Sequence, residues 1–430
     1  MQTRRDHVQA YQFAMGRLAS ALVSGDPGRG DSPTRRSALG TVFGVGLVVL
    51  LCAGYGVYGL ISPVAKDDWR KDGAIVLEED TGNRYVYANG QLRPTRNYAS
   101  ALLIAGGRTT PETVSAKTLA GVPHGTPVGI QGAPDTVPEE SQLFTGAWAR
   151  CLPENGPADK GQSLVFGGSA SALSAVPDDR QVLLGGPKGT RYVLLRGVKY
   201  PVPAESTLIA LGLDDQTILS ATADWLAGVP TGAALTAPVP SGAGKAAGQV
   251  AGQAAEVGQV FRTSTGGTEH YYLMRSDGLA RVNATEYALL AARPGAPAAR
   301  QVGQADIAVA PVSADAGTTG HLPDVLSVHA LDGGTVCLTQ LANGRSTITA
   351  GTPADGRIVL PAGGGVLAVP EGGTTEYLVT EQGVKYRIAD SDAARALGLG
   401  DSKRTLALPA DVLALIPDGP VLSRAAAAKG

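Results

Sequence analysis

The sequence predicts an α+β fold: an N-terminal helix, one membrane-spanning helix, and an outer domain of four hairpin-plus-helix repeats around a central, mainly antiparallel sheet with pseudo-twofold symmetry. Three observations predict it. One apolar segment is long enough to cross a bilayer, a short motif recurs four times after it, and two cysteines occupy matching places in two related halves. Glycine (58 residues) and proline (28) make up a fifth of the 430 residues, which favours short strands and turns over long helices.

The first 25 residues predict a helix with one apolar face. The residues of that face step by three and four along the chain: Val8, Tyr11, Met15, Leu18 and Leu22. Gly25 and Pro27 end the helix. The face can bury itself on the membrane surface, on a partner helix or on its own copy, and we expect it to be a cytoplasmic docking face.

Residues 39–61 predict a transmembrane helix. These 23 residues carry no charge and would span ~34 Å as a helix at ~1.5 Å per residue, enough for a hydrocarbon layer of ~30 Å. A cleaved signal peptide has a shorter apolar region of about 7–15 residues. Arginines precede the segment, including Arg35 and Arg36, whereas charges of both signs follow it. The N-terminus should therefore lie in the cytoplasm and everything after about Gly73 outside it, as in a single-pass plasma-membrane protein.

A hairpin motif recurs four times after the span. Each copy has an aromatic residue, β-branched residues, a polar residue and glycine at the tip, and a second short strand, which predicts a β-hairpin. The copies are Tyr85–Arg93, Tyr192–Tyr200, Tyr272–Arg281 and Tyr377–Tyr386, with tip glycines Gly90, Gly197, Gly278 and Gly383. A helical stretch follows each hairpin, at 97–104, 204–211, 283–290 and 390–397. We expect Asn283 and Glu286 to cap the third of these helices.

A proline follows every tip glycine at a nearly constant distance. Pro123, Pro230 and Pro311 lie 33 residues after their tip glycines, and Pro417 lies 34 residues after Gly383. Three of the four prolines end a similar segment, such as Leu226-Ala-Gly-Val-Pro230. Four matches at one offset indicate a true internal repeat.

The spacing of the tip glycines, 107, 81 and 105 residues, predicts two related halves. The longer intervals contain the apolar runs Val182–Gly185 and Val366–Val369, which we expect to join one shared central sheet. An Ala/Gly/Pro-rich stretch, 236–259, reads as the linker between the halves.

The expected organisation of the chain follows from these patterns. Its segments are 1–38 (cytoplasmic helix and basic flank), 39–61 (transmembrane helix), 62–76 (linker), 77–130 (repeat 1), 131–189 (central module, first half), 190–235 (repeat 2), 236–259 (linker), 260–312 (repeat 3), 313–373 (central module, second half) and 374–430 (repeat 4 and C-terminal tail).

Cys151 and Cys337 predict a disulfide between the halves. Each lies 46 residues before a tip glycine, Gly197 or Gly383, so the two thiols could meet across a pseudo-twofold axis. Thiols outside the cytoplasm usually oxidise. Two buried free thiols are the alternative. Cys52 lies in the apolar span, where we expect it only to fill space.

No motif predicts catalysis, a metal site or a cofactor. The nearest sequence to a phosphate loop surrounds Lys245, but it lacks the leading glycine and the final hydroxyl. His321 and His329 flank Asp324 without a third ligand at metal spacing, so we expect a surface pair. The net charge of −2 gives no reason to expect a nucleic acid as partner. The sequence therefore indicates a scaffold more than an enzyme.

Three segments resemble EccB, the single-span membrane component of actinobacterial type VII (ESX) secretion systems. They are Thr3–Phe13, Gly54–Leu60 and Asn97–Ala101, and the two outer cysteines fit as well. The resemblance implies assembly with EccC-type ATPase, EccD-type and EccE-type membrane components and a mycosin-type protease, in a complex of sixfold symmetry. ATP hydrolysis is sometimes attached to this family, but no residues here match such a role.

Two classes of function are thus expected. The first is a structural core component that anchors and braces a secretion machine in the membrane. The alternative is a membrane-anchored outer protein that binds the cell wall or is hydrolytic, including towards ATP.

Overall fold

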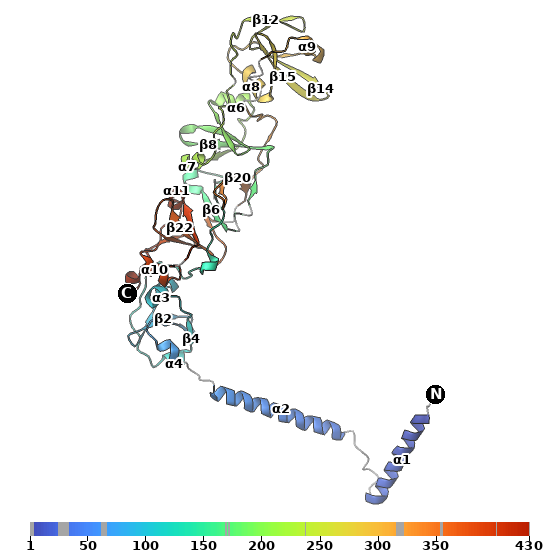
Figure 1. The fold of residues 1–430 in the computed structure, drawn as a ribbon, viewed down its shortest axis with the longest axis vertical. Helices are drawn as coiled ribbons and strands as arrows, with labels where there is room; N and C mark the ends of the chain where they lie inside the picture. The colour runs from blue at the N-terminus through green and yellow to red at the C-terminus, as the bar shows by residue number, and fades with distance from the viewer. Residues whose placement is uncertain are drawn as a thin grey trace. The chain divides into compact units, whose positions relative to one another are not determined.

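The computed structural model describes residues 4–24, 34–61, 67–167, 170, 173–236, 238–314, 322–352, 356–400 and 402–429. The chain divides into two compact units, Met1–Trp69 and Arg70–Gly430. The first unit contains helices α1 (Arg4–Ser24) and α2 (Thr34–Ile61), as Figure 1 shows. Both helices form where the sequence predicts them; Gly25 and Pro27 lie outside the described residues.

The second unit contains four sheets, which we call R1 to R4, whose four main strands have the same order (Figure 1); R2 has a fifth strand, β18 (His329–Ala330), paired with its first. In each sheet the first strand pairs antiparallel with the second, which forms a hairpin with the third, and parallel with the fourth. One helix precedes the fourth strand and another follows it.

The elements of R1 and R2 have the following bounds. R1 comprises β1 (Ile75–Glu78), β2 (Arg84–Ala88), β3 (Gln91–Pro94), α3 (Tyr98–Ala105), β4 (Glu112–Val114) and α4 (Ala116–Leu119). R2 comprises β8 (Arg180–Gly185), β9 (Arg191–Leu195), β10 (Val198–Val202), α6 (Glu205–Ala210), β11 (Ile218–Ser220) and α7 (Ala223–Ala227).

R3 and R4 repeat this succession. R3 comprises β14 (Val260–Thr265), β15 (Thr268–Arg275), β16 (Gly278–Val282), α8 (Ala284–Ala291), β17 (Arg300–Gln301) and α9 (Gln304–Val309). R4 comprises β22 (Gly365–Pro370), β23 (Tyr377–Thr380), β24 (Lys385–Arg387), α10 (Ser391–Ala396), β25 (Thr405–Leu408) and α11 (Ala410–Ala414). The short helix α12 (Arg424–Ala427) follows R4.

The four predicted hairpins and the predicted cap of the third repeat helix are present, but Gly278 is not at a hairpin tip as expected: it is the first residue of β16 and pairs with Arg275. Gly90, Gly197 and Gly383 have φ of 73°, 75° and 72°, a left-handed conformation that glycine adopts without steric cost. Asn283 accepts a hydrogen bond from the Glu286 amide, and the Glu286 side chain accepts one from the Asn283 amide. This reciprocal pair is the capping box that the sequence predicts.

The recurring prolines have a physical role that their spacing alone does not show. In every sheet the amide of the residue one or two positions after the tip glycine donates to the proline carbonyl. The four bonds are Leu92 to Pro123 (2.9 Å), Lys199 to Pro230 (2.9 Å), Leu279 to Pro311 (2.7 Å) and Lys385 to Pro417 (2.9 Å). In each of R1 to R4 this bond connects the end of the second helix to the hairpin. It explains the nearly constant distance in sequence between the tip glycine and the proline.

A six-stranded central sheet lies between R2 and R4. Its strand order is β21-β6-β5-β19-β20-β7. Its strands are β5 (Trp148–Cys151), β6 (Ser163–Phe166), β7 (Ser174–Ala175), β19 (Thr335–Gln340), β20 (Ser346–Gly351) and β21 (Ile358–Val359). One expectation is wrong here. The runs at Val182 and Val366 form β8 and β22, which belong to R2 and R4 and not to the central sheet. A continuous apolar run indicates a buried strand without saying which sheet it joins.

Two expected boundaries also need correction. The stretch 236–259, expected to be a linker, contains the hairpin β12 (Ala246–Val250) and β13 (Gln253–Glu256). Val250 and Ala255 are buried in the core of R3, together with Phe261. R1 likewise begins at Ile75, inside the segment expected to be linker. A few apolar residues are enough to hold this glycine-rich hairpin in place, because R3 supplies the rest of the core against which they pack.

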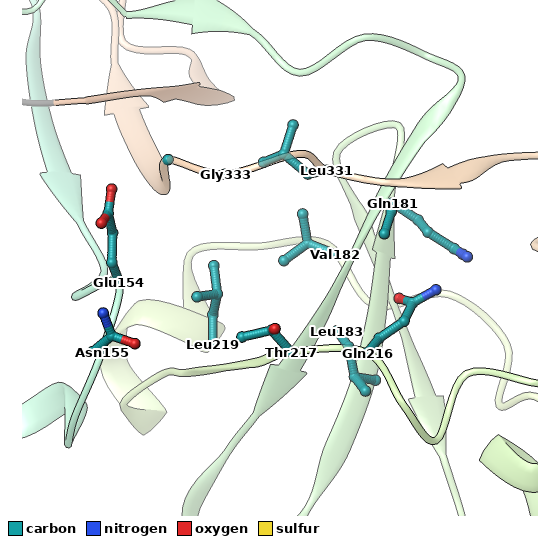
Figure 2. A pocket seen from close by; sticks show the side chains of 12 residues that line it. Glu154, Asn155, Gln181, Val182, Leu183, Gln216, Thr217, Leu219, Leu331 and Gly333 are labelled. Atoms are coloured by element: carbon teal, nitrogen blue, oxygen red, sulfur yellow. The ribbon is translucent and has the colours of Figure 1, made fainter.

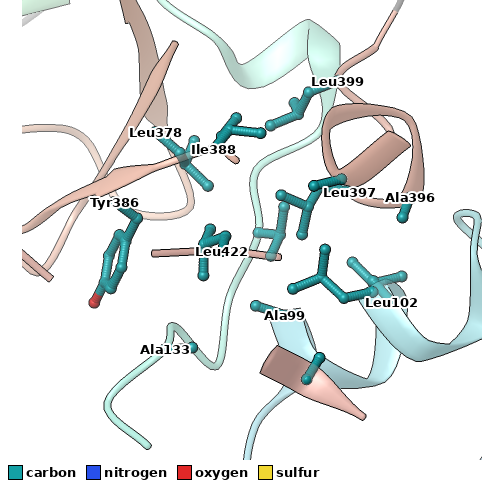
Figure 3. Close-up of a cluster of buried hydrophobic side chains, with 14 of the residues drawn as sticks. Ala99, Leu102, Ala133, Leu378, Tyr386, Ile388, Ala396, Leu397, Leu399 and Leu422 are labelled. Carbon is teal, nitrogen blue, oxygen red and sulfur yellow. The ribbon is translucent and has the colours of Figure 1, made fainter. Parts of the chain in front are cut away.

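The largest apolar cluster among the described residues joins R1 to R4. Leu102 of α3 belongs to one cluster with Leu397, Leu378 and Leu422, all with an exposed fraction of 0% (Figure 3). Alanines such as Ala99 and Ala396 let the helices α3 and α10 approach closely. A smaller cluster joins R2 to R3, where Ala288 and Leu289 of α8 are only half-buried.

Candidate functional site: the central sheet and the N-terminal helices

The centre of the outer unit is the antiparallel pair β5–β19. Cys151 stands directly opposite Cys337, and the two form a disulfide with a Cα–Cα distance of 3.9 Å. The Leu152 amide donates to the Val336 carbonyl, so the cysteine pair occupies the neighbouring position without backbone hydrogen bonds. Cα atoms approach most closely at such positions. The register of the two strands therefore brings the thiols together.

The disulfide lies on one face of the central sheet. Both cysteines are fully buried beside Ala149, Val165 and Val359. The bond joins segments 186 residues apart in the sequence. Because R4 follows one strand and R2 follows the other, it fixes the two halves of the outer unit to each other.

The side chain of Arg150 lies on the opposite face of the same sheet and bonds to several elements there. Its guanidinium donates to Gln162, to Asp411 of α11 (2.5 Å) and to Thr222 (3.4 Å), the N-cap of α7. The Arg150 carbonyl also accepts the indole N–H of Trp225 at 3.0 Å. One buried side chain thus links R2, R4 and the central sheet. Sequence reasoning missed it because an isolated arginine in a short strand gives no signal of its partners.

Two equivalent lysines, one in R2 and one in R4, bond to the backbone after the second helix of their sheet. The Lys199 ammonium donates to the Val229 carbonyl, and that of Lys385 donates to the Ile416 carbonyl at 2.5 Å. Both carbonyls lie just after the second helix of their unit, where negative helix-end charge favours a cation. Lys385 also pairs with Asp418 at 3.0 Å. In R2 the position that corresponds to Asp418 is Thr231, so Lys199 has no carboxylate at that position. Burial lowers the pKa of Lys199.

The five residues of the expected docking face lie along α1. Val8, Tyr11, Met15, Leu18 and Leu22 are all at least half exposed. Phe13 and Val23 are exposed as well, so apolar side chains are not confined to one stripe. The helix thus presents apolar surface that needs a lipid or protein contact.

Within the described residues, one helix is long and apolar enough to cross a membrane. It is Gly40–Tyr58 of α2, 19 residues whose side chains are exposed. Cys52 is free and exposed in this segment. These properties fit a lipid-facing helix, since a soluble protein would bury so apolar a surface.

The described residues offer little for catalysis. No cluster of three His, Cys, Asp or Glu side chains suits a metal ion within them. Lys245 lies in a turn just before β12, with no helix after it to bind a phosphate. His321 lies outside the described residues, while Asp324 accepts a hydrogen bond from Thr285 at 3.3 Å.

The sequence matches the family described as type VII secretion system ESX-1, transport TM domain B, over residues 1–430. The chain belongs to the EccB family. It is 29% identical to the ESX-5 secretion system ATPase EccB5 of Mycobacterium marinum, over 98% of the chain and 92% of that protein. It is 26% identical to the ESX-1 secretion system ATPase EccB1 of Mycolicibacterium smegmatis, over 99% and 94%.

Solved structures of EccB share the fold. The EccB3 dimer from the ESX-3 core complex is similar with a TM-score of 0.50 and 25% identity, over 83% of this chain and 100% of that chain. An intact ESX-5 inner membrane complex contains a chain similar with a TM-score of 0.53 and 24% identity, over 99% and 95%. The expected resemblance to EccB is therefore confirmed.

Proposed function

We propose that the chain is a structural core component of a type VII secretion membrane complex and acts in protein export. The observation that carries the proposal is the family match over the whole chain. The similar structures belong to an inner membrane complex and to a periplasmic assembly from it, which supports a membrane protein with a large outer domain.

In this proposal α2 anchors the chain with its N-terminus in the cytoplasm. Arginines on the N-terminal side of the span support that orientation by the positive-inside rule. The second unit, which carries the disulfide, then lies in an oxidising compartment. Anchor and outer domain together would brace the machine across the membrane.

The outer domain would act as a scaffold built from four copies of one unit. The shared strand order of R1 to R4 supports this repeat. A pseudo-twofold relation is supported by the central sheet, where β6 and β20 flank the central pair β5–β19. The disulfide and Arg150 would hold the two halves in a fixed relation, as a scaffold requires.

The partners would be EccC-type, EccD-type and EccE-type components, a mycosin-type protease and further copies of the chain in a sixfold assembly. Purification of the tagged full-length chain from its native membrane in mild detergent tests this. We expect membrane partners to co-purify in stoichiometric amounts. A chain that purifies alone and retains cell-wall fragments would instead support the alternative function, binding of the wall.

The apolar face of α1 would be the cytoplasmic docking element. Leu18→Asp places a charge on that face and should reduce recovery of partners at least tenfold, because the contact must desolvate the carboxylate. Gln9→Asp, which adds the same charge to a polar position of the helix, is the control. Normal assembly of Leu18→Asp would show that the face only lies on lipid.

The relatives carry the word ATPase in their names. We propose that the outer domain of this chain hydrolyses no nucleotide, because its sequence lacks a phosphate loop. The full-length chain purified to constant specific activity should show no phosphate release above a detergent blank. A rate that falls on changing Lys245→Ala would contradict the proposal, since that lysine has the most loop-like surroundings.

A further inference from the structure

R1 and R3 carry different side chains at one place where the same elements meet. Arg84 immediately precedes the recurring tyrosine of β2, and Tyr271 immediately precedes that of β15, so the two residues occupy the same position of their hairpins. Tyr98 and Ala284 both follow a capping asparagine, as the first residues of α3 and α8. The strand position and the helix position can therefore be compared directly between the two sheets.

In R1 this place holds a cation of the chain itself. The guanidinium carbon of Arg84 lies 5.6 Å from the centre of the Tyr98 ring, and a guanidinium nitrogen lies 3.3 Å from the Asp135 carboxylate. Asp135 follows the segment to which the capping Asn97 donates at Ile130. An aromatic ring beside a carboxylate suits a guanidinium, which stacks on the ring and donates charge-assisted hydrogen bonds to the carboxylate.

R3 has a ring and a carboxylate at this place without the cation of R1. The strand position carries Tyr271 instead of Arg84, and the helix position carries Ala284 instead of Tyr98. The carboxylate is that of Asp324, which follows the segment bonded by the asparagine cap of α8. A pocket of about 460 Å³ opens here, and Tyr271, Ala284 and Asp324 are among its lining residues.

Two carboxylates beside Tyr271 can accept a cation. Glu269 also lines the pocket and lies on the same face of β15 as Tyr271, two residues away. Neither Glu269 nor Asp324 forms an ion pair within the described part of the chain, and Asp324 accepts a side-chain hydrogen bond from Thr285. Burial raises the pKa of the Tyr271 hydroxyl, and the charges of Glu269 and Asp324 raise it further, so both carboxylates lie close to this residue.

The arginines near the pocket do not take the role that Arg84 has in R1. In the pairing of β15 with β16, Arg281 is one position out of step with Tyr271, so the two side chains lie on opposite faces of the sheet. The Arg281 guanidinium lies 3.3 Å from Nδ1 of His270. Arg262, which stands opposite Tyr271, donates to the Gln301 side chain at 3.1 Å and is not among the described lining residues.

A second pocket lacks these contacts and serves as a comparison. Figure 2 shows this pocket, of about 270 Å³, beside β8 of R2. Glu154 and Asn155 lie at one end of it, and aliphatic side chains such as Val182 and Leu219 lie in its middle. Its described lining has one carboxylate and no aromatic residue, so it offers a cation no ring to stack on.

We propose that the R3 pocket binds the guanidinium group of a ligand, stacked on Tyr271 and donating to Asp324 and Glu269. The ligand takes the role that Arg84 has in R1. A planar group that stacks and donates in two directions matches a ring and two carboxylates better than an ammonium, which is a compact point charge. An arginine side chain of a protein segment and a free arginine derivative share this chemistry.

Two probes test whether the charge is recognised. N-acetyl-arginine amide and N-acetyl-citrulline amide have nearly the same shape, but citrulline carries a neutral urea in place of the guanidinium. Binding to the full-length chain in detergent is measured by saturation-transfer NMR titration. We expect the arginine derivative to saturate with Kd on the order of 1 mM, as befits one charged group in an open pocket. The citrulline derivative should bind at least tenfold more weakly.

A third probe distinguishes the two sources of the guanidinium. It is the blocked tripeptide acetyl-glycyl-arginyl-glycinamide, titrated in the same way. Affinity at least fivefold above that of the single residue identifies a protein segment as the ligand, because the added backbone then makes contacts of its own. Equal affinity identifies a small molecule.

Matched variants locate the binding. Asp324→Asn removes a charge with little change of shape and should weaken the arginine derivative at least fivefold, and Tyr271→Leu should weaken it at least threefold. Asp135→Asn, the same change at the carboxylate that Arg84 already occupies, and Glu154→Gln, in the pocket of Figure 2, are controls that should bind as wild type does. If Tyr271→Leu does not fold, judged by thermal unfolding, Asp324→Asn alone decides.

Three results would overturn the proposal. Equal binding of the citrulline derivative would show that the pocket recognises no cation. The same Kd in wild type and Asp324→Asn, or a loss of binding in Glu154→Gln, would place the probe elsewhere. No saturable binding by the arginine derivative would show that the pocket holds solvent only.

Discussion

R4 and R2 have the same strand order but are stabilised very differently. On the R4 side, α10 and the C-terminal α12 pack against α3 of R1 in the largest described apolar cluster, and Lys385 has a carboxylate partner in Asp418. On the R2 side, the contact with R3 depends on a half-buried helix face, and Lys199 has Thr231 where Lys385 has Asp418. One topology therefore carries a large, fully buried apolar junction and a smaller, less buried one.

The polar contacts of α8 have counterparts in α3, where the Ile130 amide donates to the Ser100 hydroxyl at 2.9 Å and the Asn97 side chain donates to the Ile130 carbonyl at 2.7 Å. The side chain of Thr285 in α8 accepts from the Val325 amide at 2.9 Å, and Asn283 donates to the Leu322 carbonyl at 2.8 Å. Such bonds each contribute about 1 kcal/mol net, less than a buried leucine. Since these polar bonds occur on both sides, the smaller apolar burial at the R2–R3 junction is the difference: that side should open first, with low protection from hydrogen exchange, while the R1–R4 side opens last.

The largest expected effect comes from cutting the covalent tie between the two sides. Cys337→Ser should lower the free energy of unfolding by about 5 kcal/mol, by the loop-entropy model for a bond 186 residues apart in sequence. Urea denaturation should then show the two sides unfolding separately. Cys52→Ser changes a free cysteine and serves as control. Non-reducing peptide mapping that finds Cys151 and Cys337 as free thiols would contradict the premise.

A matched pair of leucines compares the two junctions directly. Leu397→Ala opens a cavity between R1 and R4 and should cost about 3 kcal/mol, whereas Leu289→Ala at the R2–R3 junction should cost about 1 kcal/mol. The reason is burial: Leu397 is fully buried and Leu289 is half-buried. Equal shifts of the urea midpoint in the two variants would remove the difference between the junctions.

Two equivalent helix caps sharpen the comparison. Asn97 caps α3 and donates to the Ile130 carbonyl at 2.7 Å, as Asn283 caps α8 and donates to Leu322. Asn97→Ala should cost about 2 kcal/mol and Asn283→Ala about 1 kcal/mol, because only Asn97 is buried. Hydrogen exchange should rise in R3 alone for Asn283→Ala. Exchange that rises equally in R1 and R3 would argue against separate junctions.

The smallest effect should come from giving Lys199 a carboxylate. Thr231→Asp copies the Lys385–Asp418 pair and should stabilise by about 0.5 kcal/mol. Burial lowers the pKa of Lys199, and the new carboxylate should raise it again by favouring the ammonium. The pair lowers the pKa of the new carboxylate, so the gain is present at neutral pH and is lost as pH falls below about 4, the ordinary pKa of Asp. Asp418→Thr should have the opposite sign.

The sequence alone determined the local elements and the covalent link. Glycine tips, helix caps and apolar periodicity depend on neighbours within a few residues, so the hairpins, α1 and the span could be predicted. The pairing of Cys151 with Cys337 could also be predicted from the sequence, because two equal offsets from a repeated motif define equivalent positions.

The tertiary structure decided which strands share a sheet and what each buried polar group contacts. The runs at Val182 and Val366 are equally apolar in either sheet, and only packing assigned them to R2 and R4. Arg150 bonds to Thr222 and Asp411, which are both distant from it in sequence, so no local pattern could reveal these partners. The same holds for the pocket beside Tyr271. Contacts between residues far apart in sequence depend on the summed burial of whole sheets, which local propensity does not determine.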